Sequence, residues 1–199
     1  MSAAGIAGRN SGRAAGRLQT IVVIAIAVIV LGTLAYVASG PGAQDGVTKV
    51  ELTGDTTGSA PAPGDIPPAF TATTYDGKQV SLADYAGKPL WLTFGASWCP
   101  DCRTEAPDVE ATYQANKDKG LAVLAVFINE SAADIGGYAQ RAGLTFPIAV
   151  DERTTIASAY QTLGIPTHFF IGADGKIREV RIGALSKDDM DRAIAAIMN

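Results

Sequence analysis

The chain has 199 residues, of which 47% are hydrophobic and 18% are charged, and its formal net charge is −4. This length and composition suit one compact domain of ordinary size with appendages. From Asp65 onward, 12 Lys and Arg stand against 17 Asp and Glu, a net charge of −5. An acidic domain without a basic stripe argues against nucleic acid as a partner.

The first 38 residues are typical of a basic segment followed by a membrane anchor. The only charged side chains in residues 1–17 are Arg9, Arg13 and Arg17, and an apolar run from Leu18 to Ala38 follows them. As a helix this run would span about 31 Å, which is close to the hydrocarbon thickness of a bilayer. The arginines predict that residues 1–17 are cytoplasmic and that everything beyond Gly40 is outside. A cleaved signal peptide is the alternative, and the length of the run favours a retained anchor.

Residues 39–64 are rich in Gly, Pro, Ser, Thr and Ala, which is the composition of a flexible linker. Alternating apolar and polar residues at 47–52 could add one short strand. We therefore expect the folded domain to comprise residues 65–199.

Within this domain, two short strands, Phe70–Thr74 and Gln79–Leu82, flank an Asp76-Gly77 turn and predict a β-hairpin. One helical turn is expected at Asp84–Gly87. The residues of Pro89–Gly95 are nearly all apolar, as in a strand that is buried on both faces. A helix is expected to follow from residue 100 to about Lys119, with Ala106, Val109, Tyr113 and Ala111 on its inner side.

The rest of the domain alternates strands and helices. We expect strands at 121–128, 147–150, 167–171 and 177–182, and helices at 131–141, 154–163 and 186–198, ended or capped by glycine, serine and threonine. The last two strands are joined by a tight Asp174-Gly175 turn. This order predicts an α/β fold with a mixed central sheet and helices on both faces, preceded by an N-terminal β-hairpin.

The only two cysteines of the chain stand three residues apart in the sequence Trp98-Cys99-Pro100-Asp101-Cys102. At the start of a helix, this spacing brings the side chains close enough for a disulfide. Such a small loop would contribute only about 2 kcal/mol to stability. A bond that stabilises little and forms easily indicates redox chemistry rather than a structural role.

The position of the pair after a buried strand suggests the role of each sulfur. Cys99 would lie at the N-cap, exposed at the carboxyl edge of the sheet, where the helix dipole favours a thiolate. Pro100 would take the first helical position, where its missing N–H costs nothing. Cys102, one turn further and more shielded, would be the resolving thiol of the Cys99 nucleophile. A static disulfide is an alternative, and half of a zinc site is another, although the chain offers only two Cys and one His as ligands.

The stretch FGASWCPDCRTEAP, followed downstream by GIPTHFFIGADGKI, resembles the thioredoxin superfamily and in particular its membrane-anchored TlpA/ResA-like thiol-disulfide oxidoreductases. The resemblance covers residues 65–199. It implies that Pro166 follows a cis peptide bond and presents the backbone of Ile165 to an extended substrate. It also implies that Trp98 and Pro100 contact the substrate, and that Glu105 exchanges a proton with Cys102. An ordinary first-turn carboxylate is the alternative for Glu105.

Two departures from thioredoxin itself affect the chemistry. Thr93 stands where thioredoxin has a buried aspartate, so Glu105 or water must serve as the proton relay. Asp101 places a negative charge beside both sulfurs, and a like charge raises the pKa of a thiol. We therefore expect Cys99 to be less acidic than the dipole alone would make it, which favours a reducing couple.

These features predict an extracytoplasmic reductase of protein disulfides that needs no cofactor beyond its own Cys99–Cys102 pair and no metal. Its partners would be an exported disulfide-containing protein, with apocytochrome c suggested by the resemblance, and a membrane electron donor of the thiol type. A copper-binding chaperone that uses Cys99, Cys102 and His168 is one alternative. A thiol peroxidase is another, although Ala96 replaces the threonine that peroxiredoxins carry three residues before their reactive cysteine. A disulfide-forming oxidase is the last, and the redox potential would distinguish it.

Overall fold

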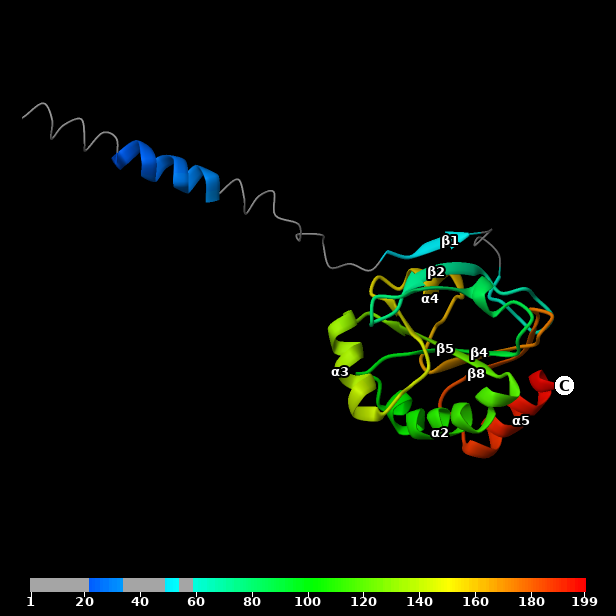
Figure 1. Ribbon diagram of the computed structural model, residues 1–199. Coiled ribbons are helices and arrows are strands. Elements are labelled where there is room, and N and C mark those ends of the chain that lie inside the picture. The colour runs from blue at the N-terminus through cyan, green and yellow to red at the C-terminus, as the bar shows by residue number, and fades with distance from the viewer. Residues whose placement is uncertain (1–21, 34–48, 54–58) are drawn as a thin grey trace, which may run out of the picture. The chain divides into compact units, whose positions relative to one another are not determined.

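The computed structural model describes residues 22–33, 49–53 and 59–199 (Figure 1). The chain divides into two compact units, residues 1–46 and 47–199. In the first unit, residues 22–33 form a helix whose large apolar side chains are exposed. Among the described residues, no helix is both long and apolar enough to cross a membrane. The basic segment 1–17 and the two ends of the expected anchor, 18–21 and 34–38, lie outside the described residues.

The second unit is built on a five-stranded sheet with the order β6-β5-β4-β7-β8. Strand β4 (Leu90–Gly95) is central and fully buried, and it pairs in parallel with β5 (Ala122–Ile128) and antiparallel with β7 (Thr167–Ile171). Strand β6 (Ile148–Asp151) lies at one edge and β8 (Ile177–Ile182) at the other. The sheet is therefore mixed, as the sequence predicts.

Three helices cover one face of this sheet. They are α2 (Pro100–Asn116), α3 (Ala132–Ala142) and α5 (Lys187–Met198), and their apolar side chains share one core with Trp91 and Phe170 of the sheet. Figure 1 shows α2 and α5 together beneath the sheet. Ala111 lies on the exposed side of α2, so its predicted inward position is wrong.

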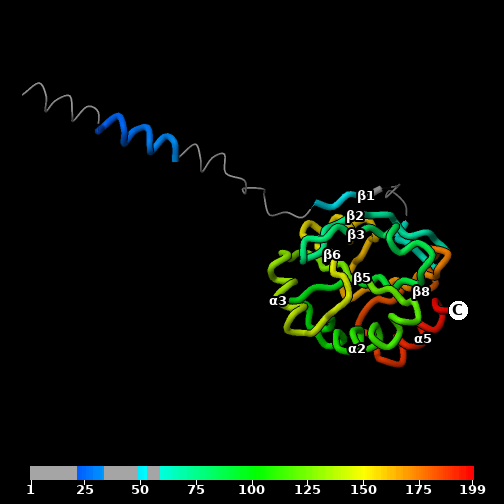
Figure 2. Tube along the Cα trace, viewed as in Figure 1, coloured from blue at the N-terminus to red at the C-terminus, as the bar shows by residue number. Residues whose placement is uncertain are grey.

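The opposite face is covered by a small antiparallel sheet and one short helix. The small sheet has the order β1-β2-β3, and its strands are β1 (Glu51–Thr53), β2 (Ala69–Thr73) and β3 (Gln79–Ser81) (Figure 2). The helix is α4 (Thr155–Ala159). Both pack on a second core that includes Phe94, Phe169 and Tyr160. The prediction placed helices on both faces of the central sheet. On this second face, the small sheet covers the core together with α4.

Strand β1 lies inside the stretch expected to be a linker, residues 39–64. It pairs with β2 in the register Glu51↔Thr71, and the N–H of Gly64 donates to the carbonyl of Ile177 at 2.8 Å. The folded unit therefore begins before Asp65, because these backbone hydrogen bonds attach the preceding residues to it. Residues 39–48 and 54–58 of the expected linker lie outside the described part of the chain.

The helix ends follow the local signals in most places. The side chains of Ser131 and Ser186 accept hydrogen bonds from the N–H groups of Asp134 and Asp189, and α3 ends at Gly143, whose φ of 67° favours glycine. Two boundaries were predicted wrongly. A 3-10 helix occupies Leu82–Tyr85 instead of residues 84–87, because Ser81 and Asp84 form a capping box, and α4 ends at Ala159 rather than at residue 163.

Candidate active site

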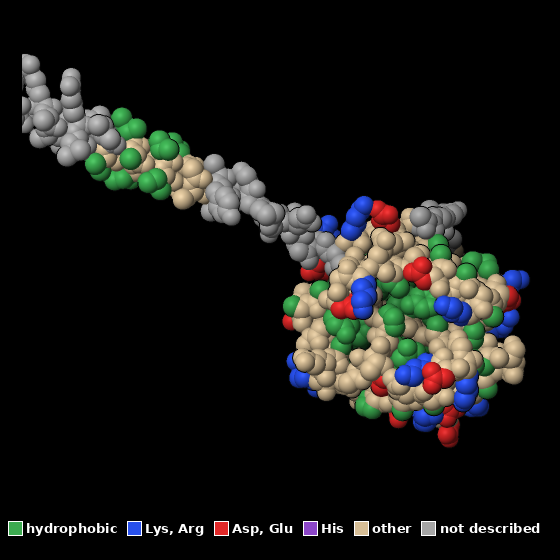
Figure 3. All heavy atoms as spheres, in the orientation of Figure 1, with side chains coloured by type: hydrophobic (Ala, Val, Ile, Leu, Met, Phe, Trp, Pro, Cys, Tyr) green, Lys and Arg blue, Asp and Glu red, His purple; other side chains and the backbone are tan. Residues whose placement is uncertain are grey.

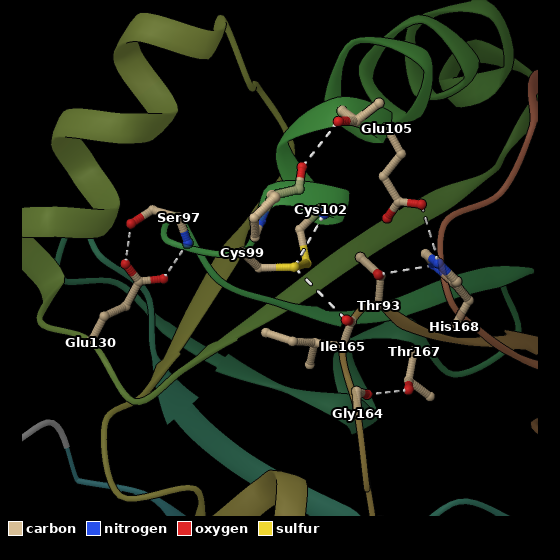
Figure 4. The surroundings of a disulfide bond; sticks show 12 residues. Thr93, Ser97, Cys99, Cys102, Glu105, Glu130, Gly164, Ile165, Thr167 and His168 are labelled. Carbon is tan, nitrogen blue, oxygen red and sulfur yellow. Dashed lines mark hydrogen bonds and ion pairs between the residues drawn. A yellow bond between two sulfur atoms is a disulfide. The ribbon is translucent and has the colours of Figure 1, made fainter.

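The cysteine pair lies where the central strand β4 passes into helix α2 (Figure 4). Cys99 is the N-cap residue of α2 and is disulfide-bonded to Cys102, with 5.3 Å between their Cα atoms. The N–H of Cys102 donates to Sγ of Cys99 at 3.2 Å. Pro100 takes the first helical position, as expected. An N–H of the helix terminus is thus already directed at the sulfur on which a thiolate would form.

The two sulfur-bearing residues are less accessible than the sequence suggested. Cys99 is 4% exposed and Cys102 is 7% exposed, so the expectation of an open Cys99 and a more shielded Cys102 is wrong. The reason is that Ala96 and Ile165 pack against the pair and cover it.

The loop that faces the disulfide carries the expected proline. The Ile165–Pro166 peptide bond is cis, which confirms this prediction. The carbonyl oxygen of Ile165 lies 3.8 Å from Sγ of Cys99, and the N–H of Gly183 donates to the carbonyl of Pro166 at 2.8 Å. Strand β7 therefore places the backbone of Ile165 beside the sulfur, where an extended polypeptide could pair with it.

Large apolar side chains are exposed in the segments that adjoin the cysteines and the proline loop. Within residues 59–199, the exposed large apolar side chains are Ile66, Trp98, Leu163 and Ile182. Trp98 precedes Cys99, Leu163 stands two residues before Ile165, and Ile182 pairs in register with Thr167. We call Trp98, Leu163 and Ile182 the apolar rim. Only Trp98 of these three was predicted from the sequence, because a large apolar residue in a loop or at a strand end carries no signal of exposure.

A cleft of about 630 Å³ opens beside the disulfide, between α2 and α3. Ser97 and Pro100 form its edge nearest the cysteines, and Arg103 and Arg141 lie further along it. Elsewhere on the domain, charged side chains of both signs are scattered over the face shown in Figure 3.

The loop before Cys99 is held by a glutamate that the sequence analysis missed. The N–H of Ser97 donates to Glu130 Oε1 at 2.7 Å, and the Ser97 hydroxyl donates to Glu130 Oε2. Burial raises the pKa of Glu130, although these hydrogen bonds from Ser97 act in the opposite direction. The sequence does carry a signal for this contact. Ser97 follows β4 and Glu130 follows β5, and the carboxyl ends of neighbouring parallel strands meet at one edge of a sheet.

On the inner side of α2, Glu105 lies in a buried polar group. It is 5% exposed, and the N–H of Leu185 donates to its Oε2 at 3.1 Å. His168 Nε2 lies 3.4 Å from the same oxygen. The Nδ1 of His168 accepts the indole N–H of Trp91 at 3.2 Å and lies 3.0 Å from Thr93 Oγ1. Glu105 and Thr93 were expected near the cysteines from the sequence, whereas the contact of each with His168 is seen only in the fold.

This arrangement gives no support to a copper site. The ring nitrogens of His168 face Trp91, Thr93 and Glu105 rather than the sulfurs. Within the described ranges, no three His, Cys, Asp or Glu side chains are grouped so that they could hold a metal ion.

Comparison with known proteins agrees with this geometry. Residues 63–180 match the model of the AhpC/TSA family. The chain is 34% identical over 139 residues to the thiol-disulfide oxidoreductase ResA of Geobacillus kaustophilus, which covers 70% of this chain and 80% of that protein. Among solved structures, a thiol:disulfide interchange protein DsbE from Chlorobium tepidum, described as putative, superposes with a TM-score of 0.67 at 28% identity, covering 70% of this chain and all of that one. StoA from Bacillus subtilis superposes with a TM-score of 0.56 at 25% identity, covering 64% of this chain and 97% of StoA.

The raised pKa of Glu130 predicts a specific dependence of stability on pH. The ordinary pKa of a glutamate is 4.5, and below this pH the protonated Glu130 makes its full contribution to the free energy of unfolding. This contribution is lost as the pH rises through the pKa of Glu130 in the folded state. We expect the free energy of unfolding of the wild type, relative to Glu130→Gln, to be larger at pH 4.5 than at pH 7. Urea unfolding at the two pH values measures this difference. Asp118→Asn, at an exposed carboxylate, is the matched control, and parallel curves for wild type and Glu130→Gln would contradict the interpretation.

Proposed function

The chain belongs to the AhpC/TSA family and is a thiol-disulfide oxidoreductase of the ResA-like type, and on this premise we propose that it is an extracytoplasmic reductase of protein disulfides. The observation that carries the proposal is the position of Cys99. Its sulfur lies between an N–H of α2 and the backbone carbonyl of Ile165. A nucleophilic sulfur and a strand-like docking edge for a polypeptide therefore occupy the same place.

The apolar rim supports a protein rather than a small molecule as substrate. Trp98, Leu163 and Ile182 expose 53%, 96% and 72% of their surfaces around the cis-proline loop. Exposed aromatic and aliphatic side chains of this kind mark surfaces that bind other polypeptides. Trp98, Pro100, Ile165 and Pro166 are accordingly the residues proposed to contact the substrate.

The reduced enzyme would act in two steps. The Cys99 thiolate attacks one sulfur of the substrate disulfide, so that a Cys99–substrate mixed disulfide forms and the other substrate sulfur leaves as a thiolate, which takes a proton from solvent. Cys102 then loses its proton, and its thiolate attacks Sγ of Cys99. This attack closes the Cys99–Cys102 disulfide and releases the second substrate sulfur as a thiolate. Two electrons thus pass from the enzyme dithiol to the substrate.

Glu105 is the proposed acceptor of the Cys102 proton. It stands one helical turn after Cys102 on the buried side of α2, where bulk water does not reach it easily. Thr93 cannot take this role because a threonine hydroxyl does not titrate in the relevant range. The carboxyl group would return the proton to Cys102 when the electron donor reduces the disulfide of the same molecule again.

The proposed location is the outer face of a membrane, with residues 18–38 as the anchor. Three arginines precede this run, and the positive-inside rule then directs the domain out of the cytoplasm. The described part of the run supports the proposal, because its helix at residues 22–33 exposes many large apolar side chains. Such surface is stabilised in a hydrocarbon environment.

In an oxidising compartment, a reductase needs electrons delivered to it. The proposed donor is a membrane protein with a reactive dithiol, which would reduce Cys99–Cys102 by the reverse of the two steps above. Apocytochrome c with an oxidised pair of haem-binding cysteines is the proposed substrate, as the resemblance to the TlpA/ResA-like oxidoreductases implies.

The two cysteines should have separable roles in turnover. We expect Cys99→Ser to abolish the reduction of insulin disulfides, because the attacking sulfur is lost. Cys102→Ser should retain the first step and accumulate a mixed disulfide through Cys99, which mass spectrometry of the intact protein detects. Turnover by Cys99→Ser, or a mixed disulfide through Cys102 instead, would contradict the assignment.

The redox couple should be reducing. We expect the equilibrium potential of Cys99–Cys102 in glutathione or dithiothreitol buffers to lie near about −270 mV or below, as for thioredoxin, and not near about −120 mV, as for a strong oxidase. Removing the negative charge beside the sulfurs in Asp101→Asn should stabilise the thiolate and shift the potential by roughly 10–30 mV toward oxidising values. Asp108→Asn, further along the same helix, should leave the potential unchanged. A wild-type potential near that of an oxidase would reverse the proposed direction.

The anchor proposal predicts where the chain is found in a bacterial cell. The full chain should sediment with membranes and resist extraction by high salt or alkali, whereas a variant without residues 1–38 should remain in the supernatant. A membrane-impermeant thiol reagent should label the reduced full chain in intact spheroplasts. Full chain in the soluble fraction, or labelling only after lysis, would count against an anchored outer domain.

A further inference from the structure

A fully buried histidine on β7 lies between the central strand and the active-site helix. His168 pairs in register with Thr93 of β4, so their side chains emerge on the same face of the sheet. Trp91 stands two residues before Thr93 and therefore also emerges on that face. Above it lies α2, which contributes Glu105 (Figure 4). Trp91, Thr93, Glu105 and His168 are all at most 7% exposed.

The contacts of His168 fix its tautomer. The indole N–H of Trp91 is only a donor, and it points to Nδ1 at 3.2 Å. Nδ1 is therefore the acceptor nitrogen, and the Thr93 hydroxyl at 3.0 Å must donate to it as well. The proton of the neutral imidazole then stands on Nε2.

The proton on Nε2 of His168 faces a single acceptor among the described residues. Nε2 makes no hydrogen bond of standard geometry within the described residues, and the acceptor it faces is Glu105 Oε2 at 3.4 Å. The same Oε2 already accepts the N–H of Leu185 at 3.1 Å. With two N–H groups directed at Oε2, the carboxyl oxygen left to gain or lose a proton is Oε1. In Figure 4 this second oxygen is directed to the side of Thr93 and Cys102.

We propose that His168 is a positioning residue of the redox reaction, which holds Glu105 by Oε2 so that Oε1 receives the proton of Cys102. This inference rests on the proposed function, because it concerns the resolving step. In that step the Cys102 S–H bond breaks, the proton moves to Oε1, and the sulfur electron pair attacks Sγ of Cys99. Trp91 and Thr93 act indirectly, because their hydrogen bonds orient the imidazole ring that holds Glu105.

A histidine that merely fills the core would satisfy Trp91 and Thr93 through Nδ1 and would have no need of Nε2. The two nitrogens can be separated by substitution. In His168→Asn the amide oxygen can replace Nδ1 as acceptor, whereas the donor to Glu105 is lost. In His168→Gln the longer amide can place its NH₂ group near the position of Nε2 and so keep a donor for Glu105.

Titratable groups on the neighbouring elements include Tyr138 of α3, which interacts electrostatically with Arg103, Glu130 and Glu105. Burial raises the pKa of Tyr138. Arg181 of β8 pairs in register with His168 and is bound to Glu179, and Asp189 of α5 is bound to Arg192. The part of α5 that packs on this core is apolar.

The test is the pH profile of the resolving step, measured by stopped flow as the loss of a preformed mixed disulfide in the full chain. We expect Glu105→Gln to slow this step by about 100-fold. His168→Asn should slow the resolving step by about tenfold or more and should change its pH profile in the same way as Glu105→Gln does. His168→Gln should keep most of the wild-type rate. Thermal unfolding of each variant shows how much stability it has lost. Equal rates in wild type and His168→Asn, or equal losses in His168→Asn and His168→Gln, would overturn the inference.

A measurement on the wild type makes the test independent of whether the variants fold. His168 is the only histidine of the chain, so ¹⁵N NMR of the imidazole is unambiguous. We expect a neutral ring protonated at Nε2, whose Nε2–H signal shifts when the disulfide is reduced. A ring protonated at Nδ1, or an Nε2–H signal that is the same in both redox states, would overturn the inference. If the wild type does not reduce protein disulfides at all, the proposed function fails instead.

Discussion

The antiparallel pairing of β4 with β7 is the interaction on which this site depends. It sets Phe94 opposite Thr167 and Thr93 opposite His168. One consequence is that the loop before β7 meets the turn after β4, so the Ile165 carbonyl reaches Cys99. The other is that His168 emerges on the face covered by α2. A slip of one residue would turn His168 to the opposite core and would separate the proline loop from the sulfurs.

The same pairing explains how a carboxylate can be tolerated beneath α2. Cys102 and Glu105 are one turn apart on the buried side of the helix, next to a large apolar core. A buried carboxylate without partners would cost several kcal/mol. Leu185 supplies one donor, and His168 faces the same oxygen with a second N–H. The proposed proton acceptor of Cys102 is thus held inside the core by groups from two other segments of the chain.

Local signals predicted the strands, the capping serines, the cysteine pair and the cis-proline. These features depend on neighbours within a few residues, or on a motif that brings its own context. Contacts between distant segments were not predictable in the same way. Glu130 holds Ser97 across 33 positions, and His168 meets Trp91 across 77. The burial of Cys99 also required the fold, because Ile165, which packs against it, comes from the loop before β7, 66 positions further along the chain.

The disulfide separates two environments with different tasks. Toward solvent lies the apolar rim of Trp98, Leu163 and Ile182, which offers contact area and no titratable group. Toward the core lie Glu105, His168 and Thr93, which are polar and have almost no exposed surface. In the proposed mechanism, substrate contact and proton transfer use different side chains, so the rim could change to fit another polypeptide without altering the resolving step. Substitution is more restricted at Glu105, His168 and Thr93, because the polar atoms of these side chains depend on partners from other segments of the chain.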